Sequence, residues 1–233
     1  MLRTIGLLGG MSWESTVPYY RTVNEVVRAR LGGLHSAKVA LVSVDFAEVE
    51  RLQHAGDWAA AGALLAAAAR SLEAAGADFV VLCTNTMHKV ADAIEAAVGI
   101  PLLHIADPTA EAVRAAGVRT VGLLGTRFTM EQDFYVGRLE RRHGLTVRTP
   151  PPEDREIVHR VIYEELVVGR VLEPSRTAFR RIIGDLVARG ARGVILGCTE
   201  ISMLVGPGDA SVPSFDTTAI HATAAAERAI AQA

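Results

Sequence analysis

The chain has 233 residues, of which 50% are hydrophobic and 21% are charged, and its formal net charge is −2. This composition supports a well-buried core and excludes general disorder, while the lack of a basic surplus excludes the attraction on which nucleic-acid and anionic-membrane binding depend. With only two cysteines, Cys83 and Cys198, a disulfide scaffold is excluded, and no set of thiols or paired histidines is present for a zinc site or other metal site.

The first apolar segment, TIGLLGG at residues 4–10, predicts a strand and a glycine-rich loop. Trp13 and Glu14 follow where a secretion signal would need small residues. The longest apolar run, residues 59–69, is shorter than the roughly 20 residues that a membrane-spanning helix needs. We therefore expect a compact cytoplasmic protein that does not enter a membrane.

Six further short segments rich in Val, Ile and Leu alternate with longer helical patterns. They are residues 39–46, 78–84, 100–105, 120–126, 193–199 and 212–215. Continuous apolar strands separated by helices are typical of parallel sheets that are buried on both faces. The sequence therefore predicts an α/β fold.

Several helix ends are recognisable in the sequence. An alanine-rich helical pattern ends at Gly76 and another ends at Gly190, because glycine readily adopts the left-handed conformation that stops a helix. Asp107 and Asp216 each follow a short proline-containing strand, and Pro108 has the place of a first helical residue. Both aspartates are predicted to cap helices.

The chain contains an internal repeat. TIGLLGG at residue 4 recurs as TVGLLGT at residue 120, ADFVVLCTNT at residue 77 as ARGVILGCTE at residue 191, and IP at residue 100 as VP at residue 212. The nearly constant shifts of 116, 114 and 112 residues, in the same order, predict two related α/β domains. We expect the first to comprise residues 1–115 plus 214–233 and the second residues 116–213.

The loops that follow the predicted strands indicate a binding site. Ligands of open α/β sheets bind outside the carboxyl ends of the strands. The loops at these ends are residues 9–12, 84–86, 126–127 and 198–200. Their glycines and hydroxyls can donate hydrogen bonds to a carboxylate, so we expect a cleft between the two domains that is lined by these loops.

The repeat also distinguishes Cys83 from Thr84. Aligning Ala77 with Ala191 places Thr84, rather than Cys83, at the position of Cys198. Because successive strand residues face opposite sides of a sheet, Cys83 is then expected to pack between the sheet and a helix. Thr84 and Cys198 become the paired groups of the two domains.

Two such groups on opposite sides of a small ligand suit the inversion of a stereocentre. One group removes a proton from one face of a carbon, and the other delivers a proton to the opposite face. A thiolate is accessible for this work, because free cysteine has a pKa of about 8.5. The glycines of GLLGG do not form a dinucleotide-binding motif, so no cofactor is expected, and hydrogen bonds to the substrate carboxylate would stabilise the carbanion.

At these residues the sequence resembles the aspartate/glutamate racemase superfamily, the cofactor-independent amino-acid racemases. The resemblance covers essentially the whole chain and is carried by GLLGGMSWEST at residues 6–16, TNTMH at 84–88 and GCTEI at 197–201. It implies two similar Rossmann-like, flavodoxin-like domains with parallel sheets related by pseudo-twofold symmetry. It also implies an active site in the cleft between them, an amino-acid substrate, no cofactor and a homodimer.

The chain departs from the usual pattern of this family at two places. The first motif is typically C-N-T-x-H, with one cysteine acid/base in each half, whereas Thr84 holds that position here. This resembles the L-aspartate/glutamate-specific racemases, in which Cys198 would remove a proton as a thiolate and Thr84 would donate one. Within residues 161–169, where aspartate racemases often have a lysine for the distal carboxylate, the chain has Glu164 and Glu165.

The resemblance also implies which residues surround the substrate. They are Met11, Gln53, Asn85, Thr86, Thr126, Glu165 and Thr199. Arg51, close to Gln53, is a further candidate partner for a carboxylate. His88, His104 and His221 are predicted to make structural hydrogen bonds.

The residues leave other functions open. The two glutamates allow a broad-specificity racemase of neutral or basic amino acids. Related members of the superfamily are cysteine-dependent decarboxylases or isomerases. Two α/β lobes around a cleft also describe a non-catalytic amino-acid-binding protein.

Overall fold

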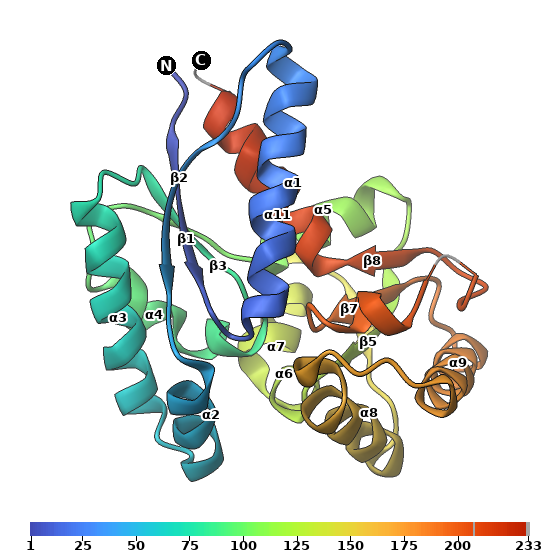
Figure 1. Cartoon of the computed structure of the whole chain (residues 1–233). Coiled ribbons are helices and arrows are strands. Elements are labelled where there is room, and N and C mark those ends of the chain that lie inside the picture. The colour runs from blue at the N-terminus through green and yellow to red at the C-terminus, as the bar shows by residue number, and fades with distance from the viewer. Residues whose placement is uncertain (207, 232–233) are drawn as a thin grey trace. The chain divides into compact units, whose positions relative to one another are not determined.

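The computed structural model describes residues 1–206 and 208–231 (Figure 1). The chain divides into two compact units, Met1–Ile105 with His221–Ala233 and Ala106–Ile220. The repeat and the resemblance placed these boundaries at residues 115/116 and 213/214. Each unit contains a four-stranded parallel sheet, so the predicted α/β class with two Rossmann-like domains is confirmed.

Unit 1 is a parallel sheet covered by helices on both faces. Its strand order is β2-β1-β3-β4. The elements are β1 (Thr4–Gly9), α1 (Trp13–Leu31), β2 (Lys38–Ser43), α2 (Phe46–Ala55), α3 (Trp58–Ala74), β3 (Phe79–Leu82), the 3-10 helix η1 (Thr86–Val90), α4 (Ala91–Glu95) and β4 (Leu102–Leu103). Helix α11 (Thr217–Ile230) starts in unit 2 and ends in unit 1.

The alternation of side chains along β1 supplies both cores of unit 1. Ile5 and Leu7 point to one face, where they pack in a cluster with buried residues of α1 and α11. Figure 1 shows these two helices side by side over that face. Leu8 points to the other face and belongs to a second cluster with residues of α2, α3 and α4. Both faces are therefore apolar, as the continuous apolar strands predicted.

Unit 2 repeats this architecture with the strand order β6-β5-β7-β8. Its elements are α5 (Ala106–Ala115), β5 (Thr120–Gly125), α6 (Arg127–Glu131), α7 (Asp133–His143), β6 (Thr146–Arg148), α8 (Pro152–Glu164), the 3-10 helix η2 (Leu166–Val168), α9 (Glu173–Ala188), β7 (Val194–Gly197), α10 (Ile201–Leu204) and β8 (Ser214–Asp216). In each sheet the order across the strands is second, first, third, fourth. The two units therefore share one topology, in agreement with the internal repeat.

In each unit a glycine at the third residue of the first strand lets a neighbouring segment approach the sheet closely. Gly6 is the third residue of β1, and a Cβ atom there would lie 2.9 Å from the Cβ of Ala77 and 3.0 Å from the carbonyl oxygen of Phe79. Gly122 is the third residue of β5, and a Cβ atom there would lie 3.0 Å from Cδ1 of Leu186 on α9. Glycine at these positions lets the neighbouring segment sit directly on the strand.

Gly6→Ala is expected to lower the free energy of unfolding by about 1–3 kcal/mol, because the new methyl group meets a backbone oxygen and a Cβ, neither of which can rotate away. Gly122→Ala should cost less, since the leucine tip that it meets can change rotamer. Gly184→Ala is the matched control: it lies exposed on α9 with open space around it and should stabilise by about 0.5–1 kcal/mol. Urea denaturation measures all three, and a Gly6→Ala protein as stable as the wild type would contradict the close approach.

Both helix ends predicted from glycine are confirmed. Helix α3 ends just before Gly76, whose φ is +84°, and α9 ends just before Gly190, whose φ is +98°. At the other end of α3, the carboxylate of Asp57 accepts a hydrogen bond from the N–H of Ala60 at 2.9 Å. In the described ranges, 1–206 and 208–231, no helix has the length and apolar character that crossing a bilayer requires.

The two aspartates predicted to cap helices behave differently. Asp216 accepts hydrogen bonds from the N–H groups of Thr218 and Ala219 at 2.9 and 3.2 Å, so its capping role is confirmed. For Asp107 the prediction is wrong, because α5 already begins at Ala106 and the carboxylate turns toward α7. There it accepts hydrogen bonds from Arg138 at 2.6 and 2.7 Å and from His143 at 2.8 Å. Partial burial opposes ionisation, but these contacts and the charge of Arg138 hold the pKa of Asp107 below its ordinary value.

Candidate active site

The loop between β1 and α1 is fixed by backbone contacts. Gly10 has a φ of +93°, and a side chain there would run into the backbone of Val44. The N–H of Gly10 donates to Oγ1 of Thr16 at 2.9 Å, and that hydroxyl lies 3.1 Å from the carbonyl oxygen of Ser12, to which it donates. The predicted glycine-rich loop therefore has a defined shape at the carboxyl end of β1.

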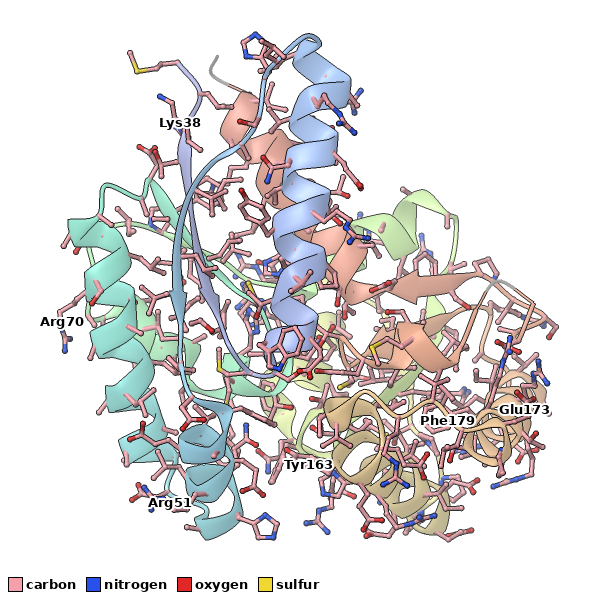
Figure 2. All side chains as sticks on the ribbon, viewed as in Figure 1. Lys38, Arg51, Arg70, Tyr163, Glu173 and Phe179 are labelled. Atoms are coloured by element: carbon pink, nitrogen blue, oxygen red, sulfur yellow. The ribbon has the colours of Figure 1, made fainter. Side chains whose placement is uncertain are left out.

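Met11 and Gln53 are both buried inside unit 1. Met11 packs in the apolar cluster of α2, α3 and α4, which also contains Met87. Nε2 of Gln53 lies 2.9 Å from the sulfur of Met87. Gln53 therefore belongs to the interior side of α2, whereas Arg51, two residues earlier, is exposed on that helix (Figure 2).

Cys83 and Thr84 follow β3, and the sequence predicted different surroundings for their side chains. Cys83 is fully buried in the cluster beneath α1 and α11, and its thiol lies 3.6 Å from the carbonyl oxygen of Val81. Burial raises the pKa of this thiol far above its ordinary value. The prediction that Cys83 packs between sheet and helix is therefore confirmed, and its thiol stays protonated in the core. Thr84, Asn85 and Thr86 follow as a run of buried polar residues.

The histidine of the first motif holds the backbone of this loop. Nδ1 of His88 donates to the carbonyl oxygen of Thr84 at 2.8 Å, and Nε2 accepts from the N–H of Ile105 at 3.1 Å. These partners require the neutral ring with its proton on Nδ1, because a carbonyl can only accept. The structural hydrogen bonding predicted for His88 is confirmed.

The other two histidines that were predicted to be structural, His104 and His221, lie near His88. The ring centroid of His104 is 4.4 Å from that of His88. His221 on α11 contacts the hydroxyl of Tyr19 through Nδ1 at 2.9 Å and the carbonyl oxygen of Leu103 through Nε2 at 2.8 Å. The structural role predicted for His221 is confirmed, since these bonds tie α11 to α1 and to the sheet.

In unit 2 the carboxyl end of β5 carries Thr126. Its Oγ1 accepts a hydrogen bond from the N–H of Thr129 at 3.3 Å, so Thr126 caps α6. Strand β7 lies next to β5, which places Thr126 and the loop of Cys198 at the same edge of the sheet. In unit 1, β1 and β3 are neighbours in the same way, so residues 9–12 and 84–86 share one sheet edge.

Cys198 lies in a cluster of three consecutive side chains that follow β7. Its Sγ donates to Oε2 of Glu200 at 3.0 Å, and Oγ1 of Thr199 donates to the same oxygen at 2.7 Å. All three residues are buried. Burial and then the charge and hydrogen bond of Glu200 raise the pKa of Cys198 well above its ordinary value, against weaker opposition from the N–H groups of Glu200 and Thr199. The resting form of Cys198 is therefore the thiol.

Sequence reasoning assigned no role to Glu200, although it stands in the quoted GCTEI motif. The signal that could have identified it is an acidic residue two positions after a thiol in a strand-end loop. Such spacing brings the two side chains together only when the loop turns, and no sequence pattern fixes that turn.

Glu165 and Glu164 at the end of α8 have opposite surroundings. Glu165 is buried, and its Oε2 accepts a hydrogen bond from the hydroxyl of Ser175 at 2.6 Å. Glu164 is exposed and lies 3.8 Å from Arg160 in an ion pair. Of the two acidic residues that replace the expected lysine, Glu165 is therefore the one held inside unit 2.

Comparison with known proteins gives consistent matches along the chain. A family model described as Asp/Glu/Hydantoin racemase matches residues 8–225. A crystal structure from Yersinia pestis, described as a candidate Asp/Glu racemase, is 61% identical with a TM-score of 0.92, and the match covers 98% of this chain and 100% of that one. A crystal structure of an aspartate racemase homologue from Pyrococcus horikoshii is 36% identical with a TM-score of 0.84, at the same coverage.

Two curated relatives are more distant. The broad specificity amino-acid racemase RacX of Bacillus subtilis is 23% identical over 155 residues, and a glutamate racemase of Persephonella marina is 25% identical over 131 residues. These matches cover 64% and 55% of this chain. They span 63% and 48% of the relatives themselves, which is less than two thirds of either protein.

Proposed function

Because this chain belongs to the Asp/Glu/hydantoin racemase family, we propose that it is a cofactor-independent amino-acid racemase of the aspartate/glutamate type. The observation that carries the proposal is the placement of one candidate proton-transfer group at the same point of each sheet. Thr84 follows the third strand of unit 1, and Cys198 follows the third strand of unit 2. Both residues are buried, and Cys198 contacts the carboxylate of Glu200.

In the proposed reaction the α-carbon is inverted by proton transfer on both faces. Cys198, as a thiolate, removes the α-proton from one face, and the hydroxyl of Thr84 delivers a proton to the other. The two enantiomers have equal free energies in water, so kcat/KM must be equal for both directions. Any preference for one enantiomer is confined to how kcat and KM are divided.

The carbanion formed in this reaction needs a stabilised carboxylate. We assign this to the donors at the strand ends, namely the side chains of Asn85, Thr86 and Thr126, with Met11, Gln53 and Thr199 as walls of the site. These groups are buried. In unit 1, Asn85 and Thr86 follow Thr84, whose carbonyl oxygen accepts a hydrogen bond from His88. Donors fixed before the substrate arrives do not need to reorganise during the reaction.

One observation favours a second candidate for the class of substrate. The family resemblance would place a cation near Glu165 to pair with the distal carboxylate of aspartate or glutamate, whereas Glu165 is itself acidic and is buried against Ser175. A neutral or basic substrate side chain would avoid that repulsion. Broad-specificity racemisation of neutral or basic amino acids is therefore the alternative, and similarity to RacX supports it.

The test is a screen of the proteinogenic L- and D-amino acids in deuterated water. We expect aspartate or glutamate to exchange its α-proton and to form the opposite enantiomer, as measured by NMR and chiral chromatography. Release of carbon dioxide would indicate a decarboxylase, and double-bond isomerisation a related isomerase. Stoichiometric binding without exchange would indicate a binding protein. The family resemblance further supports a cytoplasmic homodimer. Light scattering measures the mass of the protein in solution and thereby tests for the dimer.

A further inference from the structure

We infer that Glu200 is a positioning residue that moves the proton of Cys198 on and off its sulfur during the proposed racemisation. The inference rests on the proposed function, because Glu200 acts through the thiol rather than on the substrate. It adds a third residue, which lies in the same loop as Cys198, to the asymmetric pair of Thr84 and Cys198. Its basis is the geometry of the buried cluster after β7.

Two donors converge on one oxygen of Glu200. The thiol of Cys198 reaches Oε2 at 3.0 Å, and the hydroxyl of Thr199 reaches the same atom at 2.7 Å. An oxygen that receives two hydrogen bonds acts as an acceptor, and a base must accept a proton at such an atom. The bond from Thr199 holds Oε2 in place, so the acceptor stays within reach of the thiol. The side chain of Glu200 is buried, and little water competes for this oxygen.

The charged groups on the neighbouring elements are engaged elsewhere. Asp216, at the end of the adjacent strand β8, caps α11 through Thr218 and Ala219. Arg127, after the adjacent strand β5, lies 3.6 Å from Glu156 in an ion pair. Helix α10, which follows the loop, consists of ISML and has no ionisable side chain. Glu200 is thus the carboxylate in direct contact with the thiol.

The contact between Cys198 and Glu200 provides a way to form the thiolate that the proposed reaction needs. A buried thiol beside a carboxylate is held in the protonated form, whereas a base must be unprotonated. Transfer of the proton from Sγ to Oε2 produces a thiolate and a neutral carboxyl group without adding a net charge to the buried cluster. Removing the negative charge of Glu200 would make the thiol easier to ionise, but it would also remove the acceptor.

The protons balance in both directions. When Cys198 is the base, Glu200 takes the thiol proton, the thiolate takes the α-proton, and Thr84 protonates the opposite face of the carbanion. Thr84 then regains a proton from water, and Glu200 releases its proton to water. When Cys198 is the acid, Thr84 removes the α-proton with the assistance of water and passes a proton to it. The thiol protonates the carbanion and is restored by a proton from water that arrives through Glu200.

The experiment compares two readouts of Glu200→Gln. In a Cys83→Ala background, Cys198 is the sole thiol of the sequence, so the pH dependence of its alkylation by iodoacetamide reports its ionisation. We expect the alkylation midpoint to fall by at least about one pH unit, because a neighbouring negative charge is removed. In the same protein kcat/KM for α-proton exchange should fall by about 100-fold or more, equally in both directions, because proton-transfer partners contribute about 10²–10⁴-fold.

The thiol becomes easier to ionise while exchange becomes slower, and this combination separates proton transfer from a structural or purely electrostatic role. Glu200→Asp keeps the carboxylate and should recover part of the exchange activity. Glu164→Gln, which removes an exposed carboxylate of unit 2, should change neither readout. An active enzyme in which Glu200→Gln leaves the alkylation midpoint unchanged, or leaves exchange within about threefold, would overturn the inference alone. A wild-type protein that exchanges no amino acid would overturn the proposed function and the inference with it.

Discussion

Replacing Cys198 with alanine is expected to lower kcat/KM for α-proton exchange by about 1,000-fold or more, whereas Cys83→Ala should stay within about threefold of the wild type. Cys198 follows the strand end and contacts Glu200, so its loss removes one of the two proposed proton-transfer groups. Cys83 is fully buried among apolar side chains, and its loss affects packing alone. Deuterium exchange measured by NMR in both variants distinguishes the two thiols.

A stability measurement has to accompany this comparison. Cys83→Ala leaves a small cavity in the cluster beneath α1 and α11, and we expect a lower unfolding midpoint for it than for Cys198→Ala. Circular dichroism establishes that each variant is folded before its rate is interpreted. A folded, inactive Cys83→Ala protein together with an active Cys198→Ala protein would reverse the roles of the two cysteines.

Thr84→Ala is expected to lower kcat/KM by about 100-fold or more, since the methyl side chain cannot deliver a proton to the carbanion. Thr84→Ser keeps the hydroxyl and should stay within about tenfold of the wild type. Thr84→Cys places a thiol in each unit, which is the usual pattern of the family. That variant should remain active, and its kcat values for the two enantiomers should become more alike, because the two proton-transfer groups are then chemically equivalent.

The measurement is full progress curves from each enantiomer, followed by chiral chromatography, so that kcat and KM are separated in both directions. Because His88 binds the carbonyl of residue 84 rather than its side chain, all three substitutions leave that hydrogen bond available. Loss of activity can then be attributed to the side chain. A Thr84→Ala enzyme with unchanged exchange would remove Thr84 from the proposed mechanism and leave Cys198 to be paired with another group.

Most of the fold could be predicted because its strands are apolar and repeated. Seven of the eight strands in the described residues coincide with predicted apolar segments, and the shared strand order follows the internal repeat. The strand that was missed is β6, in which Thr146 and Arg148 are exposed at the edge of the sheet. An exposed edge strand needs no apolar run, so the pattern that identifies buried strands does not detect it.

The site could be predicted where it depends on backbone direction, but not where it depends on contacts between side chains. The prediction that Cys83 packs between sheet and helix follows from the alternation of side chains along a strand, and it is confirmed, whereas the role of Thr84 stays a prediction. The contact of Glu165 with Ser175 joins residues ten positions apart, one just after α8 and the other on α9. Asp107 failed as a cap because Arg138, 31 positions away, competes for its carboxylate. Such pairings depend on how helices pack against one another.

Helix α11 makes the completion of unit 1 depend on a segment that is synthesised after unit 2. Four of its alanines share a buried cluster with Ile5 and Leu7, yet residues 106–220 are translated between these two parts of the chain. At about 5–20 residues per second, this delay is roughly 6–23 s. For that time α1 can cover part of this apolar face of the sheet, but the part that α11 covers stays exposed. The nascent protein is therefore most exposed to aggregation, and most in need of a chaperone, just before α11 emerges.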